Sequence, residues 1–323
     1  MKKNILAAIA VLTTVLFFAC KKQTTPTPLD HTTRIEKTDE YYANLRTYKK
    51  TNHPIAFGWF GDWNPERPTK ANSLSGLPDS VDIVSIWSGG EGFEQQKQTY
   101  IDDIKNVQNL KGTRVLFTKF LHVIEDKTYP ETDEGIKGYA KSLADKVNKY
   151  GYDGMDLDYE PDFCGCTVFF KDANFALFVK EIGKYLGPKS GTGKLLLIDG
   201  SMTGGITKRS ITPELSGYFN FFVEQSYSSL TASSLQSRYN AAKSSFSPDK
   251  WVITLNYQSG GIAATFDNGA GNSYNALEGY ARWNPNEGRK GGIGAYHMQF
   301  DYSGIPSYPT YTKAIQVMNP AVK

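Results

Sequence analysis

The feature that most constrains the fold is a series of eight short apolar runs after residue 54, most of them followed by an amphipathic stretch. Most of the runs are apolar on both faces, which is typical of parallel strands covered by helices. The runs with strand character are residues 55–61, 81–87, 113–121, 152–160, 194–200, 219–228, 251–257 and 291–299. The stretches with helical periodicity are residues 38–49, 95–109, 134–150, 170–186, 234–245, 274–283 and 309–318.

This alternation predicts an α/β fold, and its count and length fit a single (β/α)8 TIM barrel over residues 37–323. An open doubly wound sheet is the alternative. That fold would carry a glycine-rich phosphate-binding fingerprint after the first strand, and the sequence has none there. We therefore expect one barrel, with its chemistry at the C-terminal ends of the strands.

The first residues have the pattern of an export signal. Two lysines follow Met1, and an apolar run over residues 5–18 leads to Cys20. This resembles a bacterial lipobox, with Phe17 where Leu is usual, so we expect a signal peptide over residues 1–19 and lipidation of Cys20. Residues 20–36 are a polar tether rich in Thr and Pro. The pattern predicts an outer-membrane lipoprotein of a Gram-negative-type bacterium, facing the cell surface or the periplasm; simple secretion with a chance cysteine is the alternative.

The composition argues against a nucleic-acid partner. The formal net charge is +3, and the chain has neither a sustained basic stripe nor a nucleic-acid-binding motif. Aromatic residues make up 13% of the chain, enough to supply stacking surfaces for a ligand as well as core packing. We expect a monomer.

The run at residues 152–160 is the most unusual strand, because it is acidic. Asp156, Asp158 and Glu160 are spaced two residues apart and would share one face, with apolar residues on the other. Like charges this close raise one another's pKa, so some of these carboxyls must hold protons or be bridged by hydrogen bonds. A solvated acidic face and a calcium loop are the alternatives, but the spacing lacks the central glycine of an EF-hand loop.

The predicted barrel gives these three acids different depths. Glu160 is the last residue of the predicted strand, at the end where barrel enzymes place their chemistry. Asp158 lies roughly 6–7 Å below it, from the rise per residue, and Asp156 lies one layer deeper. A carboxylic acid in an aromatic-lined cleft suits protonation of a glycosidic oxygen.

The stretch from Asp153 to Glu160 resembles the D-G-x-D-x-D-x-E signature of glycoside hydrolase family 18, the chitinases and endo-β-N-acetylglucosaminidases. The resemblance implies a retaining mechanism in which the 2-acetamido group of the substrate replaces an enzyme nucleophile, with no cofactor and no metal. Glu160 would act as acid and then base, Asp158 would orient the acetamido N–H, and Asp156 would support Asp158. Asp153 is assigned to the substrate-binding set.

Other strand ends carry further candidates. Gln225 and Tyr227 share a face at the end of the sixth strand, and the resemblance implies that the Tyr227 hydroxyl binds the acetamido carbonyl oxygen. Tyr296 stands on the last strand where chitinases carry a tryptophan. The other substrate-binding candidates are Trp59, Asn256 and Gln299, and Trp63 and Trp87 are possible wall residues.

Two departures from the chitinases narrow the expected activity. Tyr296 replaces the usual tryptophan, and the stretch before residue 291 is too short for the α+β domain that many chitinases insert there. Both favour an endo-β-N-acetylglucosaminidase that cleaves the GlcNAc-β1,4-GlcNAc core of N-glycans. The alternatives are a chitinase-like β-1,4-GlcNAc hydrolase and a non-catalytic glycan-binding lipoprotein. The redox state of Cys164 and Cys166 stays open.

Overall fold

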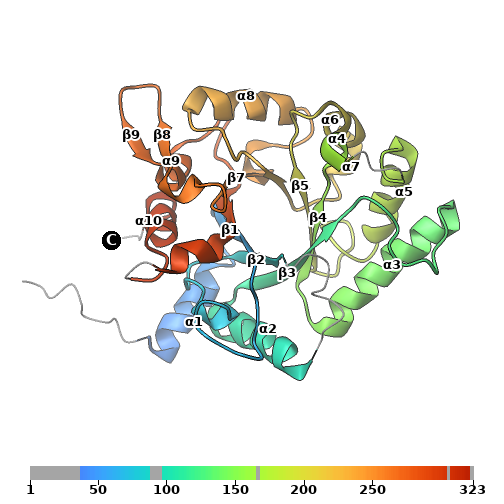
Figure 1. Ribbon diagram of the computed structural model, residues 1–323, viewed down its shortest axis with the longest axis horizontal. Helices are drawn as coiled ribbons and strands as arrows, with labels where there is room; N and C mark the ends of the chain where they lie inside the picture. Colours follow the sequence, from blue (N-terminus) through green and yellow to red (C-terminus); the bar gives the residue numbers. More distant parts are fainter. Residues whose placement is uncertain (1–36, 88–96, 165–167, 304–305, 321–323) are drawn as a thin grey trace, which may run out of the picture. The chain divides into compact units, whose positions relative to one another are not determined.

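The computed structural model describes residues 37–87, 97–164, 168–303 and 306–320, and Asp39–Lys323 forms one compact unit. Eight parallel strands close into a barrel in the order β1-β10-β7-β6-β5-β4-β3-β2 (Figure 1). The predicted (β/α)8 barrel is confirmed. The barrel strands are β1 (Ile55–Phe60), β2 (Ile83–Ile86), β3 (Arg114–Phe120), β4 (Gly154–Asp158), β5 (Leu195–Gly200), β6 (Phe221–Glu224), β7 (Trp251–Asn256) and β10 (Gly292–Tyr296).

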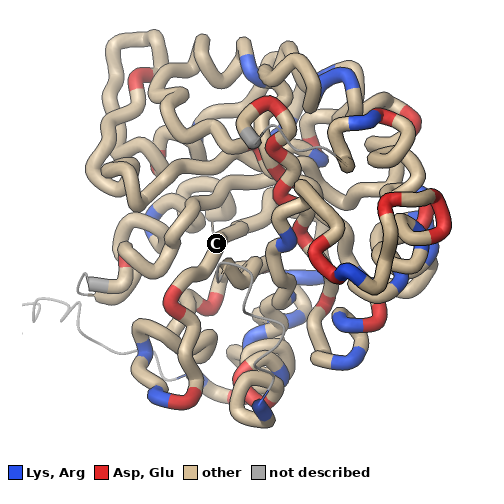
Figure 2. Tube along the Cα trace, turned by 45° about the vertical axis from the view of Figure 1, so that its right-hand side comes forward, with Lys and Arg blue, Asp and Glu red and all other residues tan. Residues whose placement is uncertain are grey.

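Helices surround these strands. The longer ones are α1 (Asp39–Tyr48), α2 (Gln98–Lys111), α3 (Asp133–Tyr150), α5 (Asp172–Ile182), α8 (Ala232–Ala242), α9 (Ala276–Arg282) and α10 (Pro309–Met318). Each of the seven predicted helices corresponds to one of these, with ends that differ by a few residues. Acidic and basic residues are interspersed along the helices and loops (Figure 2).

Several short elements were not predicted. They are α4 (Pro161–Cys164), α6 (Gly205–Ser210), α7 (Pro213–Ser216), an antiparallel hairpin of β8 (Thr265–Asp267) and β9 (Ser273–Asn275), and the 3-10 turns η1 (Leu74–Gly76), η2 (Pro248–Lys250), η3 (Gly261–Ala263) and η4 (Met298–Ser303). The hairpin follows β7, in a stretch where the sequence analysis predicted no strand. Three-residue strands and single turns give too little periodicity to predict.

The core has two layers, as a barrel requires. Ile55, Phe57, Leu116, Leu197 and Val252 belong to a cluster that fills the barrel interior. A larger cluster lies between the strands and the helices, and it includes the residues of β4 that alternate with the acids, Met155 and Leu157. The predicted division of β4 into an acidic and an apolar face is therefore present.

Two glycines set the position of β4. Helix α3 ends at Gly151, whose φ of 77° is the left-handed conformation that turns the chain toward the strand. At Gly154, a Cβ atom would lie 2.1 Å from the carbonyl oxygen of Leu195, so only glycine lets β4 approach β5 at this point. The strand that carries Asp156 and Asp158 thus begins from a tightly fixed position.

The N-terminal predictions fall outside the described residues. These are the signal peptide over residues 1–19, the tether over residues 20–36, Cys20 and, further along, Cys166. Among the described helices, none combines the length and the apolar character that a membrane crossing demands.

Candidate active site

A cavity of about 150 Å³ opens at the C-terminal ends of the barrel strands. Seven residues that the sequence analysis named line it, contributed by five of the eight strand ends. The lining consists of Trp59, Trp87, Asp158, Glu160, Asp199, Gln225, Tyr227 and Tyr296. The structure therefore brings together residues that are far apart in the sequence, in the place where TIM-barrel enzymes carry out their chemistry.

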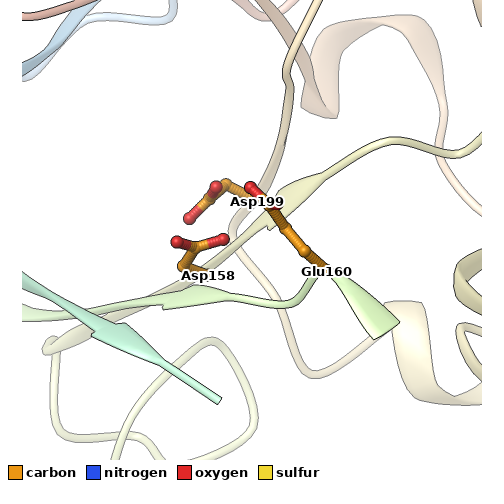
Figure 3. A group of neighbouring side chains, drawn as sticks. All are labelled: Asp158, Glu160 and Asp199. Atoms are coloured by element: carbon orange, nitrogen blue, oxygen red, sulfur yellow. The ribbon is translucent and has the colours of Figure 1, made fainter. Parts of the chain in front are cut away.

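Carboxyl groups dominate one side of this cavity. The side chains of Asp158, Glu160 and Asp199 point toward one another, with one oxygen from each within 4.8 Å of the others (Figure 3). Strand β4 ends at Asp158, so Glu160 lies two residues beyond the strand rather than at its last position. That correction places Glu160 at the mouth of the cavity, half-buried, while the carboxyl of Asp158 lies deeper.

Asp156 lies below Asp158 and is fully buried. Its Oδ2 accepts a hydrogen bond of 2.8 Å from the indole Nε1 of Trp59. Trp59 was predicted to bind substrate; it lines the cavity and also holds the deepest acid in place.

Asp199 is a site residue that the sequence interpretation missed. It is the Cα partner of Asp158 in the parallel pairing of β4 with β5, and it is 2% exposed. Gln225 Nε2 donates to Asp199 Oδ1 at 2.9 Å and to Glu160 Oε1 at 2.5 Å, so the amide bridges the two acids. The available signal was an aspartate at the C-terminal end of an otherwise apolar strand.

A glycine keeps the ends of β4 and β5 close. Gly200 has a φ of 145°, and a Cβ atom there would lie 2.5 Å from the carbonyl oxygen of Tyr159. Any larger residue would push the loop that carries Glu160 away from β5. The glycine after Asp199 thus helps to hold the two acids together.

Burial raises the pKa values of the deep acids. It raises the pKa of Asp156 to about 7. Burial, followed by repulsion from neighbouring carboxylates, raises the pKa of Asp158 and that of Asp199 well above the usual aspartate range. One oxygen of each of these three acids is buried without a hydrogen-bond partner among the described residues. The cluster therefore retains protons near neutral pH.

These raised pKa values predict that stability falls as pH rises from about 4 to about 7. In this window the native state keeps protons that the unfolded state has lost, at a cost of about 1.4 kcal/mol per pH unit for each proton. Thermal unfolding should show a lower Tm at pH 7 than at pH 5. Asp156→Asn, which can still accept from Trp59, should reduce that difference; an equal difference in variant and wild type would contradict the assignment.

Aromatic rings form the opposite wall. The rings of Tyr227 and Tyr296 stack with centroids 6.1 Å apart, and Trp59 and Trp87 meet Tyr296 edge to face. Burial raises the pKa of the Tyr227 hydroxyl well above its usual range, so this group stays protonated and can donate a hydrogen bond. A sugar ring entering the cavity would meet carboxyls on one side and aromatic faces on the other.

The three clustered carboxyls could in principle hold a cation. The Gln225 amide competes with that use, since its N–H group already donates to oxygens of Glu160 and Asp199. The remaining lining is aromatic and supplies no further carboxylate or imidazole ligand. The arrangement suits proton transfer better than metal coordination.

Asp153, predicted to bind substrate, lies at the opposite end of β4. Its Oδ2 accepts from the backbone N–H of Val115 and from Gln108 Nε2, and its Oδ1 pairs with Arg114. It lines a separate cavity of about 580 Å³ at the N-terminal end of the barrel. Five residues of strand, about 16 Å, separate it from Asp158, so the prediction is wrong and the carboxylate has a structural role.

Gln299 and Asn256 do not line the cavity either. The Gln299 side-chain oxygen accepts from the backbone N–H of Gly61, and its Nε2 contacts His297, so the amide connects the ends of β1 and β10. Asn256 Oδ1 accepts from the backbone N–H of Ser259 and closes the turn after β7. The structure gives both side chains local partners in place of the predicted substrate. Trp63 instead donates to Asp103.

Comparison with known proteins shows which family this chain is similar to. A family model described as the endo-β-N-acetylglucosaminidase EndoS TIM-barrel domain matches residues 41–295. The chain is 28% identical over 302 residues to endo-β-N-acetylglucosaminidase F2 of Elizabethkingia meningoseptica, covering 86% of this chain and 85% of that protein. It is also 28% identical to EndoS of Streptococcus pyogenes serotype M1 over 78% of this chain, which corresponds to only 30% of the longer EndoS.

A solved structure gives the same picture. The endo-β-N-acetylglucosaminidase of Cordyceps militaris superposes with a TM-score of 0.68 at 26% identity, covering 88% of this chain and 97% of that one. A mutant of that enzyme has been solved in complex with fucosyl-N-acetylglucosamine-Asn. With the barrel, the acidic strand and the family match in agreement, the chain belongs to the endo-β-N-acetylglucosaminidases of glycoside hydrolase family 18.

Proposed function

We propose that this protein cleaves the bond between the two GlcNAc residues of the N-glycan core by substrate-assisted, retaining catalysis. The observation that carries the proposal is the vertical arrangement of acids, with Glu160 at the cavity mouth and the buried Asp158 beneath it. The similarity to enzymes named endo-β-N-acetylglucosaminidases supports the choice of bond.

In this mechanism Glu160 donates its proton to the glycosidic oxygen while the bond to the anomeric carbon breaks. The acetamido oxygen of the same sugar attacks that carbon, and an oxazolinium ion forms. Asp158 accepts a hydrogen bond from the acetamido N–H and offsets the developing positive charge. Glu160 then removes a proton from the attacking water, and the sugar leaves with its original configuration.

Tyr227 completes the binding of the acetamido group. Its hydroxyl, kept protonated by burial, is placed to donate to the carbonyl oxygen that attacks. Tyr227→Phe keeps the ring that stacks on Tyr296 and removes only this donor. We expect kcat to fall about 10–100-fold with an unchanged Tm, measured by glycan release and thermal unfolding. An unchanged kcat would remove Tyr227 from the mechanism.

The proposal is tested by incubating the protein with N-glycosylated substrates and analysing the products by mass spectrometry. Cleavage within the core leaves one GlcNAc on each asparagine and releases a glycan that ends in one GlcNAc. Chitooligosaccharide should be a poor substrate in parallel. Faster cleavage of chitooligosaccharide would assign the chain to chitinase-like activity instead.

We also propose that the protein is anchored by a lipid on Cys20. The basic start, the apolar run and the cysteine at its end support this, together with the polar tether that follows. Cys20→Ser is expected to move the protein from the membrane fraction to the soluble fraction and to abolish labelling by a fatty-acid probe. Retained membrane fractionation and labelling in the variant would refute the anchor.

A further inference from the structure

The family signature accounts for the acids on β4, but it assigns nothing to Asp199 on β5. This aspartate is 2% exposed and lines the catalytic cavity. Burying a carboxyl group is costly unless its oxygens are satisfied. Oδ1 of Asp199 accepts from Gln225, whereas Oδ2 has no hydrogen-bond partner among the described residues. A second unpartnered oxygen, Oδ1 of Asp158, belongs to its register partner on the neighbouring strand.

We propose that Asp199 is a positioning residue for the reaction: through Gln225 it fixes the carboxyl group of Glu160, and with Asp158 it shares one proton. The inference rests on the proposed function for the step that it assists. The sequence analysis assigned the support of Asp158 to Asp156 alone. Asp156, however, lies a layer deeper in the barrel, and its Oδ2 already accepts a hydrogen bond from Trp59.

The first part of the role is geometric. Glu160 lies beyond the end of β4, so strand pairing does not hold its side chain. Gln225 supplies that restraint with a bond of 2.5 Å to Glu160, and Asp199 orients Gln225 through a bond of 2.9 Å to the same Nε2. A proton donor must be held close to its target oxygen, and a displacement of about 1 Å can cost a factor of about 100 in rate.

The second part is a balanced proton exchange. Asp158 needs a full negative charge when the acetamido N–H becomes acidic. The proton that it shared moves to Asp199, so none leaves the site while Glu160 gives its own proton to the leaving oxygen. When water opens the oxazolinium ion and Glu160 takes the water proton, the shared proton returns. Asp199 never contacts the reacting carbon in this scheme.

The titratable groups that face Asp199 come from two neighbouring elements. Asp156, Asp158 and Glu160 face it from β4 and the loop that follows, and Tyr227 faces it from the end of β6. None of these groups is a cation. Removing the charge of Asp199 therefore lowers repulsion within the cluster, and the remaining carboxyls lose their protons at lower pH.

The pH dependence of kcat tests the proposal with two variants that should shift the fall in kcat at alkaline pH in opposite directions. Asp199→Asn should move the alkaline limb of the profile to lower pH by about one to two units, because a negative charge is gone. Gln225→Leu should move the same limb to higher pH, because a donor that favours ionised carboxyls is gone. Both variants should lower kcat at the wild-type optimum at least about tenfold, with KM changed less than about threefold.

The contrary outcomes are distinct. A uniform loss of kcat at every pH, accompanied by a lower Tm, would mean that Asp199 only stabilises the fold. A raised KM with normal kcat in Gln225→Leu would mean that Gln225 contacts substrate instead of positioning Glu160. Matched profiles in all three proteins would overturn the proposal outright.

Failure of the proposed function would look different. If the wild-type protein cleaves no glycan, the reaction assignment fails, while proton sharing can still be measured without substrate. Asp199→Asn should then reduce the fall in Tm between pH 5 and pH 7, because one proton fewer is retained by the native state. An undiminished fall in Tm would overturn the shared proton by itself.

Discussion

Glu160→Gln is expected to slow glycan release by at least about 10³-fold while leaving the fold unchanged. The amide has the shape of the acid, and its oxygen can still accept from Gln225 Nε2. It cannot supply the proton that the leaving oxygen needs, nor remove one from water afterwards. The loss should appear in kcat, and KM should change little because the ground-state contacts remain.

A control variant distinguishes loss of the catalytic group from a general effect of replacing glutamate with glutamine. Glu131→Gln makes the same substitution at an exposed position outside the cavity and should retain wild-type rates. Equal Tm values for both variants would show that folding is intact. Release by the Glu160→Gln protein within tenfold of the wild-type rate would eliminate Glu160 as the acid.

Asp158→Asn should have the second-largest effect, a loss of about 10²–10³-fold in kcat. Asparagine fills the same buried space beside Asp199 but cannot carry the negative charge that stabilises an oxazolinium ion. A thiazoline analogue of GlcNAc, a stable mimic of that ion, should bind wild type tightly and the variant at least about 10-fold more weakly. Inhibition constants measured with both proteins provide the comparison.

This pair of measurements addresses the mechanism itself. If Asp158 were a covalent nucleophile, its negative charge would not strengthen thiazoline binding. Mass spectrometry of the denatured protein would then detect a covalent glycosyl-enzyme adduct. Asp145→Asn, an exposed change on α3, serves as the control and should leave both rate and inhibition unaltered. Equal thiazoline affinity in the Asp158→Asn and wild-type proteins would contradict substrate assistance.

The alternation of runs was enough to predict the barrel, and the two-residue period was enough to predict the shared face of Asp156 and Asp158. Both rest on local periodicity, which a sequence carries directly. Asp199 escaped prediction because a lone aspartate at a strand end has no periodic signal. Its role comes from the pairing of β4 with β5, which places it beside Asp158.

The wrong predictions have the same origin. Asp153 belongs to the family signature, yet it immediately precedes β4, which runs through the barrel, so it lies at the end opposite the cavity. Asn256 ends β7 and Gln299 follows β10, but their side-chain oxygens accept from backbone N–H groups of neighbouring segments. The sequence indicates which strand end a residue lies near. Whether its side chain enters the cavity depends on the conformation of the adjoining turns, which the sequence pattern does not predict.

The most direct test of the central claim is the mass of a homogeneous N-glycoprotein after incubation with this protein. The account predicts loss of the glycan with one GlcNAc retained on the asparagine, and no loss when the Glu160→Gln variant is used. An unchanged glycoprotein mass with correctly folded wild-type protein, or removal of the whole glycan with conversion of the asparagine to aspartate, would contradict it.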